Sequence, residues 1–120
     1  MPMASQDVLA QIAGITPGSR ADRARQAKPE LIDGAQAYYA ATITPQAPGE
    51  LSHQERTLIA WRVALLLPQR ETAAFYRDRL AALGVDPATI AAAARGPEAG
   101  GRGTRLAAIL RHVDRVATAP

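Results

Sequence analysis

Helix punctuation constrains this chain more than any other feature of its sequence. Polar residues that can cap a helix start stand at Ser5, Ser52, Asp86 and Thr104, and glycines stand where helices can end. No run of alternating β-branched residues is long enough to form a strand. We therefore predict an all-α fold, a compact bundle of five to six short helices.

Two of these helices are predicted within the first fifty residues. One is capped by Ser5, carries apolar residues from Val8 to Ile12, and ends at Gly14. The other begins at Pro29, a residue that suits the first helical position. We expect the polar segment 21–27 between them to be a connection. The second helix carries Leu31, Ala35, Tyr38, Tyr39 and Thr42 at helical spacing.

A third helix is predicted from about His53 to Leu67. Ser52 and Glu55 form the S-x-x-E pattern of a capping box, in which each side chain satisfies a free backbone N–H group. Apolar residues occupy so much of its circumference that we expect it to be buried on most sides. It is our candidate for the central helix, and Pro68 ends it because proline cannot continue a helix.

Three further helices follow this proline. A helix is predicted from Gln69 to Leu83, with Gly84 supplying the left-handed residue that ends it. The next helix starts at Pro87, and residues 96–103 are predicted to form a glycine-rich loop. Thr104 caps the last helix. Its apolar residues at helical spacing are Leu106, Ile109, Leu110, Val113 and Val116.

Composition narrows the classes of function. The chain has no cysteine, which excludes disulfides, thiolate metal sites and thiol catalysis. Of its fourteen basic residues all but one are arginine, but they are spread among acids without interleaved aromatic residues. We therefore expect no nucleic-acid partner. His53 and His112 lack the spacing of a metal pair, so we expect no metal and no cofactor.

No segment looks suited to a membrane. The longest apolar run is "VALLL", residues 63–67, which is far shorter than the roughly 20 residues that a spanning helix needs. The N-terminus lacks the basic region and apolar core of a secretory signal. We expect a cytoplasmic protein without membrane contact.

The pattern "LS..ER.LIA.RVA", a short hinge, a helix ending "A.LG" and then "VDPATIAA" resembles the carboxymuconolactone decarboxylase family, which includes the alkylhydroperoxidase D-like proteins. The resemblance covers residues 51 to about 117. It implies a helical domain over residues 51–120, with residues 1–50 as an N-terminal helical extension that folds with it as one cooperative unit. The family fold continues with another helical pair, so we expect a shortened member or a partial chain.

The resemblance also indicates where a site would lie. Peroxidase-type members combine a Glu, a C-x-x-C pair and a His around the hinge into a proton relay to a reactive thiol. The matching positions here are Thr57, Gln69, Thr72 and Tyr76, and none keeps the family residue. Thiol peroxidase activity by this chain alone is therefore not expected, and we predict a non-catalytic assembly partner or small-molecule binder.

Several alternatives stay open. Gln69, Thr72 and Tyr76 share one helix face, which is suited to a small organic ligand or, equally, to polar residues that satisfy one another. Glu71 and Tyr76 could supply acid and base for a decarboxylase- or isomerase-like reaction on a small organic acid. An antioxidant role is compatible only with a cysteine-containing partner subunit. From the family and the alanine-rich stripes we expect a trimer or hexamer, or pairing with a related subunit.

Overall fold

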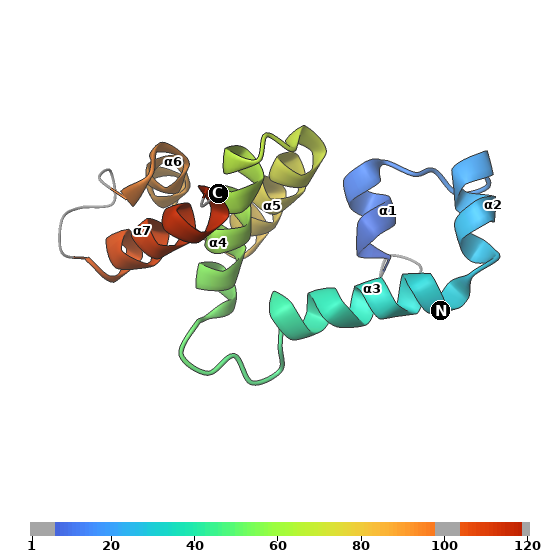
Figure 1. Cartoon of the computed structure of the whole chain (residues 1–120), viewed down its shortest axis with the longest axis horizontal. Coiled ribbons are helices and arrows are strands. Elements are labelled where there is room, and N and C mark those ends of the chain that lie inside the picture. Colours follow the sequence, from blue (N-terminus) through green and yellow to red (C-terminus); the bar gives the residue numbers. More distant parts are fainter. Residues whose placement is uncertain (1–6, 98–103, 119–120) are drawn as a thin grey trace. The chain divides into compact units, whose positions relative to one another are not determined.

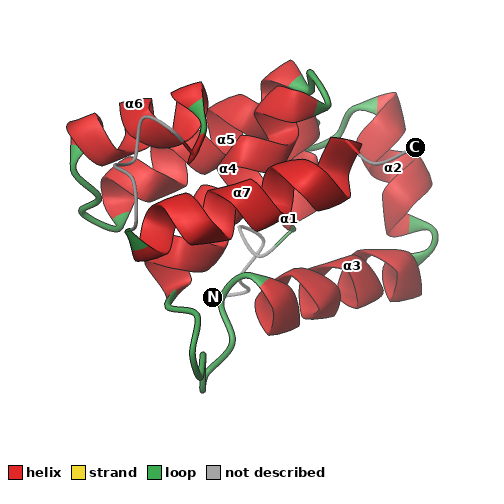
Figure 2. Ribbon diagram, turned by 60° about the vertical axis from the view of Figure 1, so that its left-hand side comes forward, coloured by secondary structure: helices red, strands yellow, loops and turns green. Residues whose placement is uncertain are grey.

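The structure is a computed structural model that describes residues 7–97 and 104–118. Seven helices and no strand occur within these residues (Figures 1 and 2), so the prediction of an all-α fold is confirmed. None of the helices in these two ranges is both long and apolar enough to cross a membrane. The helices are α1 (Val8–Ala13), α2 (Arg20–Gln26), α3 (Pro29–Thr42), α4 (His53–Leu66), α5 (Arg70–Ala82), α6 (Pro87–Arg95) and α7 (Arg105–Thr118).

The chain divides into two compact units. The first comprises residues 1–47 and holds α1, α2 and α3, while the second comprises residues 48–120 and holds α4 to α7. The division falls three residues before the start of the helical domain expected from the sequence. Whether the two units unfold cooperatively stays a prediction.

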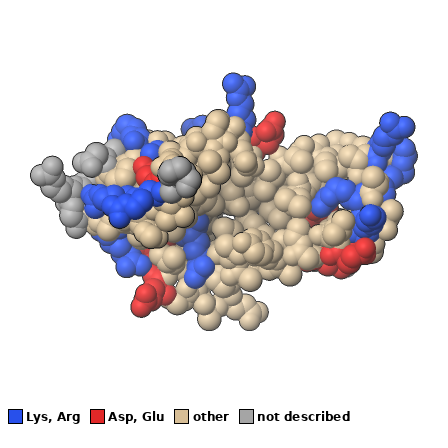
Figure 3. Space-filling model, in the orientation of Figure 1, with Lys and Arg blue, Asp and Glu red and all other residues tan. Residues whose placement is uncertain are grey.

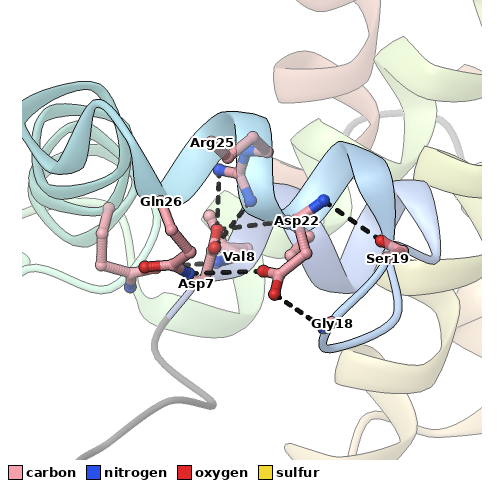
Figure 4. Close-up of polar contacts among 9 residues, drawn as sticks. Asp7, Val8, Gly18, Ser19, Asp22, Arg25 and Gln26 are labelled. Carbon is pink, nitrogen blue, oxygen red and sulfur yellow. Dashed lines mark hydrogen bonds and ion pairs between the residues drawn. The ribbon is translucent and has the colours of Figure 1, made fainter.

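The N-terminal unit begins with a cap that the sequence analysis placed elsewhere. Ser5 lies outside the described residues, and the side chain that caps α1 is Asp7, whose Oδ1 accepts from the backbone N–H of Ala10 at 3.2 Å. Asp7 also receives both Nη groups of Arg25 at 2.6 and 2.9 Å, which ties the start of α1 to α2 (Figure 4). Gly14 ends α1 in the left-handed region, as predicted.

The polar segment after Gly18 is helical, which the sequence analysis did not expect. Ser19 Oγ accepts from the backbone N–H of Asp22 at 3.1 Å, and Asp22 Oδ2 accepts in return from the N–H of Gly18 (Figure 4). These bonds satisfy donors at the start of α2, a helix that buries none of its residues. It is therefore held by caps and polar contacts, and not by an apolar face.

The N-terminal unit has little hydrophobic core. Both α1 and α2 contact α3, and both rise from the same side of it (Figure 1). The backbone N–H of Val8 donates to Gln36 Oε1 at 2.9 Å, joining α1 to α3. Val8 and Ile43 are buried, but α3 buries no residue along its length. Within the helix, Leu31 and Tyr38 are exposed.

The C-terminal unit is a helical bundle around α4. The capping box of Ser52 and Glu55 is present with both reciprocal bonds, at 3.0 and 3.1 Å. The helix contacts α5, α6 and α7, which confirms the prediction of a central helix. It ends at Leu66, with Leu67 as an exposed cap residue before Pro68.

Small side chains let these helices approach closely. Ala93 and Ala107 are fully buried, as are Leu80 and Leu110, and the indole of Trp61 donates to the carbonyl of Ile90 at 3.3 Å. Alanine contributes little buried area, so the few large side chains supply most of the hydrophobic stabilisation. The core of this unit thus depends on a small number of leucines and one tryptophan.

The predicted helix ends of this unit are confirmed. Gly84 has a φ of 78°, and the N–H of Val85 bonds the carbonyl of Leu80 at 3.0 Å, which is the long bond of a Schellman motif. Asp86 caps α6 through a bond from the N–H of Ala88 at 3.0 Å. Thr104 Oγ1 accepts from the N–H of Ala107 at 3.1 Å. Most of the predicted glycine-rich loop, residues 98–103, lies outside the described residues.

Because α7 is unevenly buried, substitutions of two of its apolar residues should differ in their effect on the free energy of unfolding. Leu110→Ala should lower the free energy of unfolding by about 3 kcal/mol, because it opens a cavity at a fully buried position. Val116→Ala, on the same helix but 63% exposed, should change it by less than about 0.5 kcal/mol. Urea unfolding followed by circular dichroism measures both. Equal losses would contradict the described packing.

Candidate functional site

The hinge between α4 and α5 is the place where the sequence analysis put a site. The chain leaves α4 at Leu67, passes Pro68 and turns so that the N–H of Gln69 bonds the carbonyl of Ala64 at 2.9 Å. Gln69 has extended backbone and is the N-cap residue of α5, but its side chain makes no cap hydrogen bond. The side-chain amide of Gln69 therefore forms no bond to the backbone at the start of α5.

A shallow, open pocket of about 300 Å³ lies at this hinge. Ala64 and Leu65 come from the last turns of α4, and Ala73 comes from the first turns of α5. Pro68 completes the apolar part of the lining, while Gln69 and Arg70 are its polar members. The pocket thus combines an apolar wall with two residues, Gln69 and Arg70, that carry polar side chains.

The predicted relay positions do not meet in this pocket. Thr57 is 1% exposed, and its hydroxyl donates to the carbonyl of His53 at 2.7 Å, so it is satisfied within α4. Thr72 and Tyr76 are half-buried, and the Tyr76 ring packs edge-to-face on Phe75 and against the core. Of the four positions only Gln69 lines the pocket.

The alternative acid and base are not brought together at the pocket either. Glu71 is exposed in the first turn of α5 and is not one of the lining residues. His112 is exposed, and its near neighbour Asp114 is engaged by Arg62, so these two form no catalytic pair. In residues 7–97 and 104–118, no three His, Asp or Glu side chains gather as metal ligands would.

Arg62 is an organising residue that the sequence analysis missed. Its Nε and Nη2 donate to the two carboxylate oxygens of Asp114, each at 2.8 Å, and its Nη1 donates to the carbonyl of Ala94 at 2.7 Å. The guanidinium of Arg62, on α4, is therefore bonded to both α6 and α7. The hydrogen bonds to Asp114 raise the pKa of Arg62. A charged residue inside the otherwise apolar stretch 58–66 of α4 was the available signal.

The backbone near this guanidinium requires glycine. Gly96, which caps the end of α6, has a φ of 114°, a conformation that side chains rarely adopt. An added Cβ there would lie 3.0 Å from Arg62 Nη2. The backbone can therefore pass this close to the Arg62 guanidinium because residue 96 is a glycine.

A second ion pair joins the starts of α4 and α7. Arg105 Nε donates to Glu55 Oε2 at 2.7 Å, and Arg105 Nη2 donates to the carbonyl of Glu50 at 2.5 Å. The Arg105 bond holds the pKa of Glu55 below its ordinary value of 4.5, with help from the backbone N–H of Ser52 and against the effect of burial. The capping carboxylate of α4 is thus also a tertiary contact.

Charged side chains form no single patch on the visible face. Basic and acidic groups are scattered over a larger uncharged surface on the face that Figure 3 presents.

Comparison of the chain with protein-family models, with curated proteins and with solved structures finds no match. The family resemblance and the activity it implies therefore stay proposals.

The lowered pKa of Glu55 predicts a pH-dependent stability. The carboxylate stabilises the fold fully above about pH 4.5, and this contribution is lost as the pH falls through the folded-state pKa. The difference in unfolding free energy between the wild type and Glu55→Gln should therefore shrink as the pH falls from about 7 to about 3. Urea titrations at several pH values measure it.

The matched control for this prediction removes Arg105, the ion-pair partner of Glu55. In an Arg105→Ala background, Glu55→Gln should cost less at neutral pH, because the largest cause of the lowered pKa is gone. A wild-type difference that stays constant over the whole pH range would contradict the role given to this pair.

Proposed function

We propose that this protein is a non-catalytic member of the carboxymuconolactone decarboxylase-like family that binds a small apolar ligand carrying an acidic group at the α4–α5 hinge. The observation that carries the proposal is the open pocket in which Ala64, Leu65 and Ala73 provide an apolar wall beside Arg70. An apolar concavity with a few polar groups is the usual form of a small-ligand site.

Arg70 supplies the specificity in this proposal. It is exposed, and it forms none of the ion pairs recorded for the described residues. A guanidinium at the edge of an apolar wall is suited to a carboxylate or sulfonate whose remaining atoms contact that wall. Gln69 adds an amide that is not used as a helix cap. A flat or aromatic organic acid fits this combination better than a sugar or a nucleotide.

The absence of catalysis rests on what occupies the relay positions. Thr57 is buried with its hydroxyl bonded to the His53 carbonyl, so it has no proton to exchange with the hinge. Gln69 neither donates nor accepts a proton as an acid or base would. The exposed position of Glu71 gives no support to the decarboxylase-like alternative, which needs this carboxylate beside the ligand.

The family membership within the proposal is supported by local structure. A capping box opens α4, a proline hinge separates it from α5, Gly84 ends α5 in the left-handed region, and α6 starts at Pro87. This is the order of features on which the resemblance was based. Assembly into an oligomer, or with a cysteine-containing partner subunit, is a further part of the proposal that the resemblance implies.

Binding of anilinonaphthalene sulfonate, an aromatic anion that fluoresces in apolar sites, tests the pocket. Arg70→Ala should weaken binding roughly fivefold, the effect of about 1 kcal/mol for one partly solvated ionic contact. Gln69→Trp should weaken it at least as much, because the indole fills the opening without removing a helix cap. Fluorescence titration measures the affinities.

Arg77→Ala is the matched control. Arg77 is an exposed arginine on the same helix and does not line the pocket, so this variant should bind as the wild type does. Equal affinities for all four proteins would contradict the hinge site. Turnover of an organic hydroperoxide by the purified chain would contradict the non-catalytic assignment.

A further inference from the structure

The segment that connects α3 to α4 is held to the protein over only part of its length. It comprises residues 44–52, because Ile43 is the cap residue that ends α3 and His53 is the first residue of α4. Two arginines of the C-terminal unit bond to its second half, residues 48–51. The two halves of this connection therefore differ in how firmly their backbone is fixed.

Arg56 supplies the main attachment. Its Nε donates to the carbonyl of Leu51 at 3.0 Å, and its Nη2 donates to the carbonyl of Pro48 at 2.8 Å. The chain turns between these two carbonyls at Gly49, whose φ of 68° lies in the left-handed region. Arginine presents its donors in a fixed fork, and hydrogen bonds from a charged donor are roughly twice as strong as neutral ones. One half-buried guanidinium thus bonds the backbone on both sides of the turn.

The start of α7 holds the same segment. Arg105 Nη2 donates to the carbonyl of Glu50 at 2.5 Å, while its Nε bonds the carboxylate of Glu55. The backbone N–H of Ser52 donates to that carboxylate as well, at 3.1 Å. Three carbonyls of residues 48–51 therefore accept from an arginine, and the capping box fixes the residue that follows them.

The residues just before this segment lack such support. Thr44 and Pro45, which follow α3, are half-buried, whereas Gln46 and Ala47 are exposed. Within the part of the chain that the structure describes, neither Gln46 nor Ala47 takes part in a hydrogen bond or an ion pair. The change from free to bonded backbone therefore falls between Ala47 and Pro48, where the two compact units also divide.

We propose that residues 48–52 are a fixed arm of the C-terminal unit, locked by Arg56, and that backbone motion between the two units is confined to Gln46 and Ala47. Pro48 reinforces this division, because proline fixes its own φ and disfavours helical backbone at the residue before it. A free connection of nine residues can extend over roughly 30 Å, whereas two residues extend over about 7 Å. The arm thus shortens the reach of the N-terminal unit by about three quarters.

Backbone order parameters of the wild-type full chain, measured by nuclear magnetic resonance, are the first test. The amides of Gly49, Glu50 and Leu51 should have order parameters of about 0.85, the value of rigid backbone, while those of Gln46 and Ala47 should lie below about 0.6. These values report motion on the picosecond-to-nanosecond timescale. Equal order parameters on the two sides of Pro48 would overturn the proposal without any variant.

Arg56→Met tests the lock. Methionine keeps an unbranched apolar side chain but removes the donors, so the order parameters of Gly49, Glu50 and Leu51 should fall to those of Gln46. Arg77→Met makes the same change at an exposed arginine of α5 and should leave them as in the wild type. Order parameters that Arg56→Met does not lower would overturn the role given to this arginine.

Proteolysis gives an independent reading, because a protease that cleaves after glutamate has a site in the arm at Glu50. Arg56→Met should speed cleavage at this bond at least fivefold, and Arg77→Met should not. Slow amide exchange at the buried Leu80 and Leu110 should show that the C-terminal unit stays folded, and sulfonate binding at the hinge should be unchanged. Should Arg56→Met unfold this unit, the wild-type order parameters decide. Equal cleavage rates in folded variants would overturn the lock.

Discussion

Arg62 lies in the middle of α4, the helix that α5, α6 and α7 all contact. Little of the Arg62 side chain is accessible to water. A guanidinium in that position must find partners within the protein, because a largely buried charge without them is costly. Asp114 supplies a bidentate carboxylate from α7, and the carbonyl of Ala94 supplies an acceptor at the end of α6. One side chain thereby sets how three helices meet.

This constraint explains other features of the C-terminal unit. The chain turns close to the guanidinium at Gly96, where a side chain would be both strained and too near. The ion pair of Glu55 with Arg105 joins the starts of the same two helices that Arg62 joins further along. With α7 fixed at both places, the alanine-rich core can be closely packed. The pocket opens at the hinge between α4 and α5.

Much of the fold could be predicted from the sequence because helix ends are encoded locally. Ser52, Gly84, Pro87 and Thr104 each act through residues within a few positions of themselves, so their roles are readable without tertiary information. The helix α2 was missed because it has no apolar periodicity, and only Ser19 marks its start.

The site could be predicted only in part. Spacing shows that Gln69, Thr72 and Tyr76 share a face, but it does not show which part of that face a neighbouring helix covers, and only Gln69 lines the pocket. The link between Arg62 and Asp114 spans 52 positions, a separation at which one sequence carries no pairing signal. Arg70 was passed over because one arginine among many has no distinguishing pattern.

The central claim is that the hinge binds an apolar anion, and amide chemical-shift mapping by nuclear magnetic resonance tests it most directly. Titration of the isotope-labelled full chain with anilinonaphthalene sulfonate should move the amide signals of Leu65, Gln69, Arg70 and Ala73 together, with one common affinity. Shifts that gather on another surface, or that spread over both units without a common affinity, would contradict the account.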